Sequence, residues 1–269
     1  MISIVGLGTG GSKIAKEFEQ YSVYNIYALD FLEKHDKPED YEKNMPDLRG
    51  RFMDIDSHVQ FFVVGSSYSS NYALGILEQI KDKKIDLIYV KPDTELLAGV
   101  PKLVERAAFG VLQEYARSGL LNSITLINNL SVEQVLQNAP IKTYYETLNN
   151  MIASSIHYVN YFENNDPIIG VKSKPPEVAR IRSIGALNMD TLEEKWFFDL
   201  DIDRDVCYYL CINNERLEND GSLHKKYGEL LKQKPRNAFR NISYSIYETE
   251  SQQDFGFCVS LTNVVQKNS

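Results

Sequence analysis

The stretch Phe61-Phe-Val-Val-Gly-Ser-Ser-Tyr-Ser-Ser-Asn71 decides the fold of this chain. It joins four apolar residues, typical of a buried strand, to a run of small polar residues, and a segment of helical periodicity follows from Ala73 to Ile80. A second apolar strand, Leu87 to Val90, is closed by Lys91-Pro92. Strand, helix and strand at this spacing predict right-handed crossovers and a parallel sheet with helices on its faces.

The same alternation continues in both directions. Downstream, the pattern predicts an amphipathic helix from Val104 to Tyr115 and a strand from Ile124 to Ile127. Upstream, the strand Ile2 to Val5 leads into a glycine-rich loop. Ligands of such sheets bind beyond the carboxyl ends of the strands. We therefore expect one site formed by four loops: Gly6–Gly11, Gly65–Asn71, Lys91–Thr94 and Asn128–Asn129.

The junction Gly6-Leu-Gly-Thr-Gly-Gly11 has the form of an anion trap, because glycines let backbone N–H groups approach a phosphate and the following helix adds its dipole. The next predicted strand, Ile26 to Asp30, ends in an acid about twenty residues further on, where a dinucleotide fold places a ribose carboxylate. Taken alone, this motif predicts a nucleotide site, with NAD the first candidate.

Composition narrows the class of protein. The 269 residues are 43% hydrophobic, enough for one large domain or two smaller ones. A net charge of −8 argues against a nucleic-acid groove or an anionic membrane surface as the main partner. No apolar run reaches the ~20 residues that span a bilayer, and no N-terminal signal is present, so we expect a cytoplasmic protein. The four histidines lack metal-ligand spacing, and no metal site is predicted.

Three cysteines, an odd number without CxxC spacing, predict buried free thiols: Cys207, Cys211 and Cys258. After residue 130 the pattern predicts a helix from Ser131, where Ser131-x-x-Gln134 has the form of a capping box, and a long helix from Lys142 to Phe162. Beyond the Pro-rich loop at 172–176 we expect a mixed region with three strands and a helix: Val206–Ile212, Leu223–Lys232 (helix), Ile242–Glu248 and Phe255–Leu261, the last two paired as a hairpin.

This order of features resembles the FtsZ/tubulin superfamily. Val5 to Ser12 resembles the first glycine-rich loop of that family, and Val90-Lys-Pro92 with the helix and strand that follow, up to Asn129, resembles its Thr-Lys-Pro segment. Tyr145 to Asn149 resembles the aromatic-to-acid spacing that grips guanine, and Ala179 to Met189 resembles the segment after the catalytic loop. The resemblance covers most of the chain and indicates a divergent member of the kind found in viruses or on plasmids.

The resemblance implies an α/β fold with a Rossmann-like parallel-sheet domain of GTPase type (1–140), a long central helix (141–165) and a smaller α+β domain (166–269). It implies a cytoskeletal protein that binds GTP or GDP, with or without Mg²⁺, and assembles head to tail with itself. The nucleotide contacts that it implies are Gly8, Thr9, Gly10, Gly11, Asp30, Gly65, Ser66, Ser67, Ser69, Ser70, Asn71, Asn129, Tyr145 and Asn149.

Departures from the family pattern affect the site. The signature loop keeps only its first glycine, Gly65, and Tyr68 brings a ring to a place where a phosphate must approach. Lys13 and Ala28 occupy positions where the family has asparagines, and Asn149 replaces the acid that pairs with guanine. An amide has one acceptor oxygen beside a donor, so the base specificity is open.

The catalytic loop differs most. Its two acids correspond to the stretch Lys172 to Glu177, in which only Glu177 can position water, while Lys172 and Lys174 reverse the local charge. A protonated lysine cannot accept a proton from water. We expect at most a slow GTPase.

Two other readings remain. One is a structural or interaction protein that keeps the fold, binds no nucleotide and uses the old site or interface for a protein adaptor. The other is a Rossmann-type enzyme that uses NAD or an adenylate, supported by Gly6 to Gly11 and Asp30.

Overall fold

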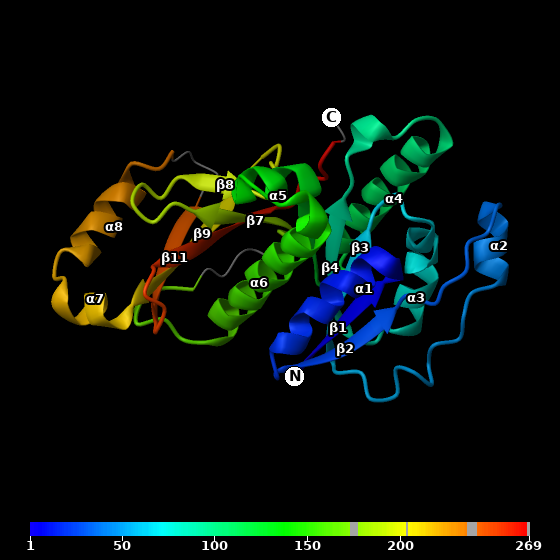
Figure 1. The fold of residues 1–269 in the computed structure, drawn as a ribbon, viewed down its shortest axis with the longest axis horizontal. Helices are drawn as coiled ribbons and strands as arrows, with labels where there is room; N and C mark the ends of the chain where they lie inside the picture. The colour runs from blue at the N-terminus through cyan, green and yellow to red at the C-terminus, as the bar shows by residue number, and fades with distance from the viewer. Residues whose placement is uncertain (173–176, 203, 236–240, 268–269) are drawn as a thin grey trace.

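A computed structural model describes residues 1–172, 177–202, 204–235 and 241–267 of the chain. One sheet runs through both halves of the molecule in the strand order β2-β1-β3-β4-β5-β7-β11-β9-β10-β6, with β8 paired to β7 (Figure 1). The strands are β1 (Ile2–Leu7), β2 (Tyr24–Leu29), β3 (His58–Val64), β4 (Lys84–Lys91), β5 (Ser123–Asn128), β6 (Ile169–Gly170), β7 (Ile181–Leu187), β8 (Glu194–Trp196), β9 (Asp205–Asn213), β10 (Asn241–Thr249) and β11 (Phe255–Thr262).

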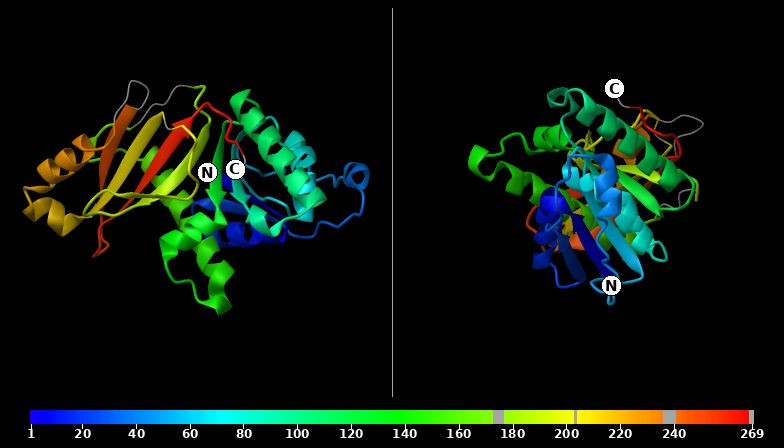
Figure 2. Two further views of the ribbon diagram at one scale, coloured as in Figure 1. Left: turned by 90° about the horizontal axis from the view of Figure 1, so that it is seen from above. Right: turned by 90° about the vertical axis from the view of Figure 1, so that its right-hand side faces the viewer.

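Helices cover both faces of the sheet. The α-helices are α1 (Gly8–Lys16), α2 (Pro38–Lys43), α3 (Ala73–Gln79), α4 (Val100–Arg117), α5 (Asn129–Leu136), α6 (Tyr144–Asn164), α7 (Asn214–Asn219) and α8 (Leu223–Lys232). Short 3-10 turns are η1 (Glu17–Gln20), η2 (Tyr68–Tyr72), η3 (Thr94–Leu96) and η4 (Ile141–Thr143). In the N-terminal half, α3 and α4 pack on one face, while α1, α5 and α6 pack on the other (Figure 2).

The N-terminal half confirms the predicted parallel sheet. Strand β1 pairs in parallel with β2 and β3, β3 with β4, and β4 with β5. The carboxyl ends of these strands therefore lie at one edge of the sheet, and their amino ends lie at the opposite edge.

The predicted boundary near residue 166 does not interrupt the sheet. Strand β5 pairs in parallel with β7, beginning at Ile124 and Ile181, so backbone hydrogen bonds cross from one half to the other. The central helix α6 packs against strands of both halves, with Phe62 on one side and Tyr209 on the other in the same core. The division into 1–140, 141–165 and 166–269 therefore remains an interpretation.

The predicted hairpin of residues 242–248 with 255–261 is wrong. Strand β9 lies between the two: β10 pairs with β9 in parallel, and β11 pairs with β9 and β7 in antiparallel fashion. The connecting loop crosses the end of β9 and is attached there, because the backbone N–H of Asn213 donates to Asp254 and its side-chain amide donates to the carbonyl of Ser251. Both β10 and β11 have the apolar pattern of sheet strands, and that pattern does not identify the neighbour.

The start of α5 also differs from the prediction. The side chain of Asn128 accepts a hydrogen bond from the backbone N–H of Leu130, so Asn128 caps a helix that begins at Asn129. The capping box predicted at Ser131 is therefore wrong, because a better-placed amide precedes it by three residues.

Residues between β2 and β3 contact β2 at the outer edge of the sheet. The guanidinium of Arg51 donates to the carbonyl of Ala28 on β2 at 2.8 Å, and the amide of Asn25 donates to Asp56 at 2.9 Å. These contacts occupy polar groups of an edge strand that would otherwise be open to pairing with another chain.

The three cysteines are free and buried, which confirms the prediction. Burial raises the pKa of the Cys211 thiol to about 11, so this sulfur is an unreactive apolar group at neutral pH. Within the described residues, no helix combines the length and the apolar composition needed to cross a bilayer.

A cluster of polar side chains lies at the amino ends of the strands, near the last turns of α6. Asp86 is buried; it accepts hydrogen bonds from Asn122 and Ser123 and lies 2.6 Å from Nε2 of His58. Burial alone raises the pKa of Asp86, but these hydrogen bonds and the charge of Arg182 outweigh it, and the net pKa lies well below the ordinary value. Asp86 is therefore ionised in the core.

We expect Asp86→Asn to lower the free energy of unfolding at pH 7 by about 3 kcal/mol, because the buried guanidinium of Arg182 loses a nearby negative charge. The folded pKa lies below the unfolded value of about 3.9, so the stabilisation is complete above that value and is lost as the pH falls below it. Urea denaturation of both proteins should show a difference that shrinks below about pH 4.

The exposed Asp82→Asn is the matched control and should change stability little. A deficit of the Asp86 variant that stayed constant down to pH 2 would contradict the assigned charge state.

Candidate functional site

The loops that follow β1 and β3 meet at Gly8 and Ser69. Gly8 has φ of +67°, a left-handed conformation that favours glycine, and a Cβ placed on it would lie 1.9 Å from the hydroxyl of Ser69. Ser69 is itself buried. Two of the four predicted loops are therefore in direct contact.

The remaining glycines of the first loop let α1 approach the sheet. A Cβ on Gly6 would lie 2.2 Å from the carbonyl oxygen of Gly11, and a Cβ on Gly11 would lie 2.7 Å from the carbonyl oxygen of Phe62 on β3. Gly10 faces Val64 at the end of the same strand. The motif is therefore required by packing, whether or not it also binds a ligand.

The exposed end of α1 is electrostatically suited to an anion. Among the described residues no side chain caps this helix, and its first turn carries no acid. Thr9 and Gly10 are exposed there, with Lys13 one turn further along. The N–H groups of a first helical turn have no partner within the helix, and the dipole favours negative charge beside them.

The serine loop after β3 uses much of its hydrogen-bonding capacity internally. The hydroxyl of Ser67 donates to the carbonyl of Val64 and lies 3.0 Å from that of Ser69, while the hydroxyl of Ser70 donates to the carbonyl of Ser67. Ser66 has φ of +55°, so the strained position is Ser66 and not Tyr68. The loop is preformed, and it offers fewer free hydroxyl donors than its sequence suggests.

Tyr68 does not obstruct the site in the predicted way. Its ring packs against the core on the α3 and α4 side of the sheet, and its hydroxyl donates to the carbonyl of Leu32. The expected clash between this ring and a phosphate is therefore wrong, because the backbone turns the side chain toward the core.

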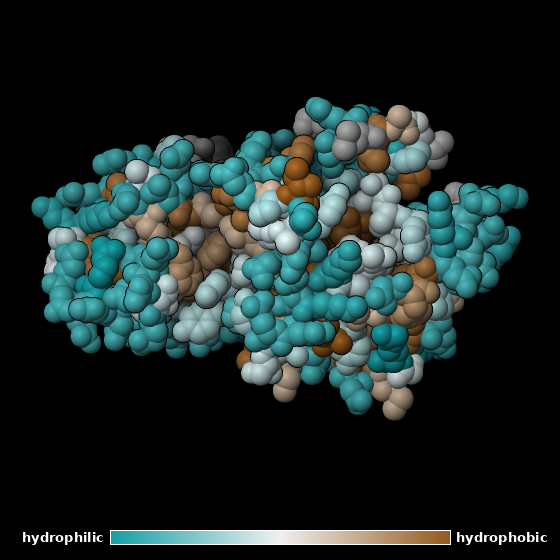
Figure 3. Space-filling view, in the orientation of Figure 1, coloured by the Kyte–Doolittle hydropathy of each residue, from teal (hydrophilic) through white to brown (hydrophobic). Residues whose placement is uncertain are grey.

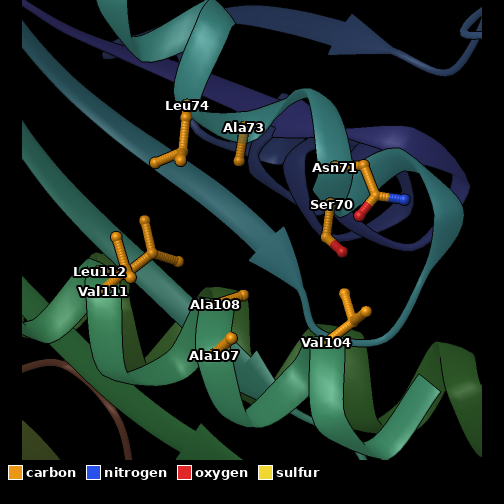
Figure 4. A pocket seen from close by; sticks show the side chains of 9 residues that line it. All are labelled: Ser70, Asn71, Ala73, Leu74, Val104, Ala107, Ala108, Val111 and Leu112. Carbon is orange, nitrogen blue, oxygen red and sulfur yellow. The ribbon is translucent and has the colours of Figure 1, made fainter. Parts of the chain in front are cut away.

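Ser70 and Asn71 border an apolar cavity instead of the end of α1. This cavity of about 290 Å³ lies between α3 and α4 and is otherwise lined by alanine, valine and leucine side chains (Figure 4). The hydroxyl of Ser70 points toward Val104 on α4 (Figure 4). Among the predicted contacts from this loop, Ser69 meets the glycine loop, at Gly8.

The end of β4 packs against the start of the loop Gly65–Asn71. The N–H of Gly65 donates to the carbonyl of Val90 at 2.9 Å, and a Cβ on Gly65 would lie 2.3 Å from the hydroxyl of Tyr89. That hydroxyl donates to Glu105, which is buried near Lys91. Burial raises the pKa of Glu105 and lowers that of Lys91, and the charge of each partly offsets the shift of the other.

The end of β5, the fourth of the predicted loops, contributes less to the site. Asn128 uses its side chain to cap α5, and its N–H donates to the carbonyl of Phe197. Asn129, the predicted ligand, is half-buried in the first turn of α5. Contacts between neighbouring loops therefore join the tips of β1, β3 and β4, while the tip of β5 carries Asn129 one strand further along the sheet.

Asp30, the predicted ribose contact, is exposed just after β2. Its carboxylate lies 3.4 Å from the ammonium of Lys16 at the end of α1. An exposed pair of this kind is weak, so the carboxylate can exchange Lys16 for a ligand hydroxyl at little cost.

A second cavity, of about 380 Å³, lies between the end of α1 and the first turns of α6. Its polar lining includes Glu17, Glu146 and Asn150, and the amide of Asn150 donates to Glu17 at 3.4 Å. The predicted base contacts Tyr145 and Asn149 precede two of these residues by one position and do not line the cavity. The sequence analysis missed Glu146 and Asn150.

Tyr145 is 68% exposed, and its ring contacts that of Tyr144 edge to face. The hydroxyl of Tyr144 donates to Glu133 on α5, which fixes the rotation of α6 about its axis. The signal that could have found Glu146 and Asn150 is their i,i+4 spacing beside the apolar stripe of α6.

The predicted catalytic residue lies at the other end of the sheet. Glu177 lines a cavity at the amino ends of the strands, so it is separated from the glycine loop of the same chain. Lys172 pairs with Asp166 at 3.1 Å, and Lys174 lies outside the described residues. In the part of the chain that the structure covers, no group of three or more His, Cys, Asp or Glu side chains has an arrangement suited to a metal ion.

Comparison of the sequence with protein-family models and with curated proteins finds no match. Comparison of the structure finds a GTPγS-form protofilament of TubZ from Bacillus thuringiensis serovar israelensis, with 11% identity, a TM-score of 0.69, and coverage of 99% of this chain and 87% of that one. The GDP-form protofilaments of the same TubZ give 11% identity and a TM-score of 0.71, covering 99% and 85%.

An empty FtsZ dimer from M. jannaschii gives 12% identity and a TM-score of 0.59, covering 97% of this chain and 88% of that one. These likenesses span nearly the whole chain and include the large sheet and the long helix. The chain therefore shares the fold of these TubZ and FtsZ structures, at a sequence identity of only 11–12%.

Proposed function

We propose that this chain is an FtsZ/tubulin-like cytoskeletal protein that binds GTP or a related nucleotide and assembles head to tail, with weak or lost hydrolysis. The observation that carries the proposal is the contact between Gly8 and Ser69, which brings the uncapped first turn of α1 beside a preformed loop at the carboxyl edge of a parallel sheet. The TubZ structures similar in fold were determined in GTPγS and GDP forms.

The phosphates of the nucleotide occupy the end of α1, near Thr9, Gly10 and the backbone of Gly65. The base occupies the cavity between α1 and α6, where Glu146 accepts hydrogen bonds from the guanine N–H groups. Helix α1 spans about 13 Å between the two places at 1.5 Å per residue, a length that an extended nucleotide can bridge. Tyr145 and Asn149 flank this cavity as further candidates for contact with the base.

The two different edges of the parallel sheet support head-to-tail assembly. The candidate site lies at their carboxyl ends, and a repeated contact between opposite ends of the sheet does not close, so it propagates into a filament. The similar TubZ structures are protofilaments. A protein adaptor and a cytoplasmic location fit this role, and the net charge of −8 argues against nucleic acid as a partner.

Slow hydrolysis follows from the charges near the end of α6. Water needs a base or an orienting acid beside the terminal phosphate, and Glu177 is the one acid of the predicted catalytic stretch 172–177. A neighbouring copy would have to deliver this single carboxylate across the contact. Mg²⁺, where it takes part, would bind through the phosphates of the nucleotide.

One observation favours the nucleotide-free alternative. The hydroxyl of Ser69 fills the space beside Gly8, and the hydroxyls of Ser67 and Ser70 bond within their own loop, so these serines need no ligand to satisfy them. An enzyme that uses NAD or an adenylate would need Asp30 on a ribose, which the weak pair of Asp30 with Lys16 would allow.

We expect the pure protein to melt at a higher temperature with GTP or GDP but not with ATP or NAD, to scatter light with GTP, and to release phosphate slowly. A ligand at 100 times its Kd should add about 2.7 kcal/mol to the free energy of unfolding. No shift with any nucleotide supports the nucleotide-free reading, and a shift with NAD alone supports the Rossmann enzyme.

We expect Thr9→Glu to weaken GTP binding by at least about tenfold, because it places a negative charge where the phosphates would lie. Without nucleotide the variant should be as stable as the wild type or more so, since an acid in a first helical turn contributes about 0.3–1 kcal/mol. Thr9→Gln has nearly the same shape without the charge and should bind GTP normally. Equal affinities in calorimetry for both variants would rule out phosphate binding at this helix end.

We expect Glu146→Gln to weaken GTP binding by about tenfold and to narrow the preference for GTP over ITP, because ITP lacks the amino group that the carboxylate would accept from. Tyr145→Ala and Asn149→Asp are the comparison variants. If Tyr145→Ala reduces affinity while Glu146→Gln leaves it unchanged, the base lies on the outer face of α6 and not in the cavity.

A further inference from the structure

A polar cavity of about 520 Å³ opens at the amino ends of the strands, on the edge opposite the glycine loop. The starts of β4, β5 and β7 form its floor, and the last turn of α6 borders it. None of the functions considered above uses this cavity as a binding site.

The inner wall of the cavity consists of charged side chains that pair with one another or with neighbouring polar groups. Asp86 is held by His58, Asn122 and Ser123, as described above. Arg182 is also buried; its Nε donates to the hydroxyl of Thr125 at 2.7 Å and its Nη1 donates to Glu163 at 3.1 Å. These groups are fixed in place before any ligand arrives.

Cationic donors remain available at the opening. Arg182 lines the cavity, and within the described residues its second terminal nitrogen, Nη2, makes no hydrogen bond. Arg180 is half-exposed and donates through Nη1 to the carbonyl of Asn122. Lys84, the exposed first residue of β4, has no carboxylate within 4.0 Å among the described residues.

The carboxylates of the cavity do not cancel all of these donors. Glu163 pairs with Arg182 and offsets its charge, Asp86 is held by His58, Asn122 and Ser123, and Glu177 is exposed. Among the described residues, Lys84 and Arg180 therefore remain without a carboxylate partner. Lys84 lies at the start of β4, and the two arginines lie at the start of β7. These two strands are the neighbours of β5 in the sheet. The side chains of lysine and arginine are long enough to converge on one small anion above β5, and arginine matches the geometry of phosphate oxygens.

We propose that this cavity binds a phosphate group through Lys84, Arg180 and Arg182. The group belongs either to a free phosphate compound or to the nucleotide of a neighbouring copy, because head-to-tail stacking places the amino edge of one sheet over the carboxyl edge of the next. The nucleotide of a neighbouring copy as the source rests on the proposed function, whereas a free phosphate compound as the source does not.

Phosphate binding is tested in a Thr9→Glu background, which removes the candidate site at α1. Inorganic phosphate and pyrophosphate are titrated calorimetrically into this protein with and without Lys84→Ala and Arg180→Ala. We expect the double substitution to weaken binding at least tenfold, and a matched pair elsewhere on the surface, Lys81→Ala with Arg117→Ala, to have no effect. Equal binding in all three proteins, or no binding in any, overturns the proposal.

Arg182 is left intact in this experiment because it packs in the core. Lys84 and Arg180 are at the surface of the cavity, and unchanged melting temperatures check that their loss leaves the fold intact. Lys84→Arg should restore phosphate binding, which a purely structural role of the lysine would not require.

The source of the phosphate is distinguished by GTP-dependent light scattering of the double variant in an otherwise wild-type chain. If the neighbouring nucleotide is the source, the variant binds GTP normally but assembles poorly, and it reduces scattering when mixed into wild-type protein. Normal assembly with lost phosphate binding identifies a free phosphate compound. If wild-type protein neither binds GTP nor scatters light, the proposed function fails, and the phosphate titration still decides this inference.

Discussion

Backbone contact between α1 and the sheet is the constraint on which the rest of the structure depends. Gly6 on β1 and Gly11 on α1 approach so closely that a Cβ on either would collide with a carbonyl oxygen. This contact sets α1 against both β1 and β3, and it places the exposed first turn of the helix beside the tip of β3. Figure 3 shows a largely hydrophilic surface on this side of the molecule, so the apolar contacts of α1 are turned inward.

The N-terminal half could be predicted from the sequence because its signals are local. Each strand is an apolar run, each helix has its own period, and parallel crossovers leave little freedom in strand order. The C-terminal half could not, because the neighbour of β10 is set by contacts far along the chain. Asp254 binds the end of β9 and carries the chain across that strand, and neither β10 nor β11 carries a local mark of this.

The position of the candidate site could be predicted from the sequence, but the side chains that line it could not. The loops at Gly8 and Gly65 follow from strand ends, whereas the direction of a side chain depends on one backbone angle or on the phase of a helix. Tyr68 turns to the core, and Ser66, two residues before it, takes a left-handed conformation. On α6, a shift of one residue moves a side chain by about 100° around the helix axis, which separates Tyr145 from Glu146.

The two edges of the sheet attract negative charge by different means. At the carboxyl edge the attraction comes from backbone dipoles of α1, which need no ionised side chain. In the site proposed at the amino edge it comes from Lys84, Arg180 and Arg182, of which Arg182 is held in place by Thr125 and Glu163. A phosphate between two such edges in a stack of copies would be stabilised from both sides, and Glu177 alone would offer a base to water. In the proposed assembly, that arrangement would favour holding a nucleotide over hydrolysing it, and it would link retention of the nucleotide to persistence of the contact between copies.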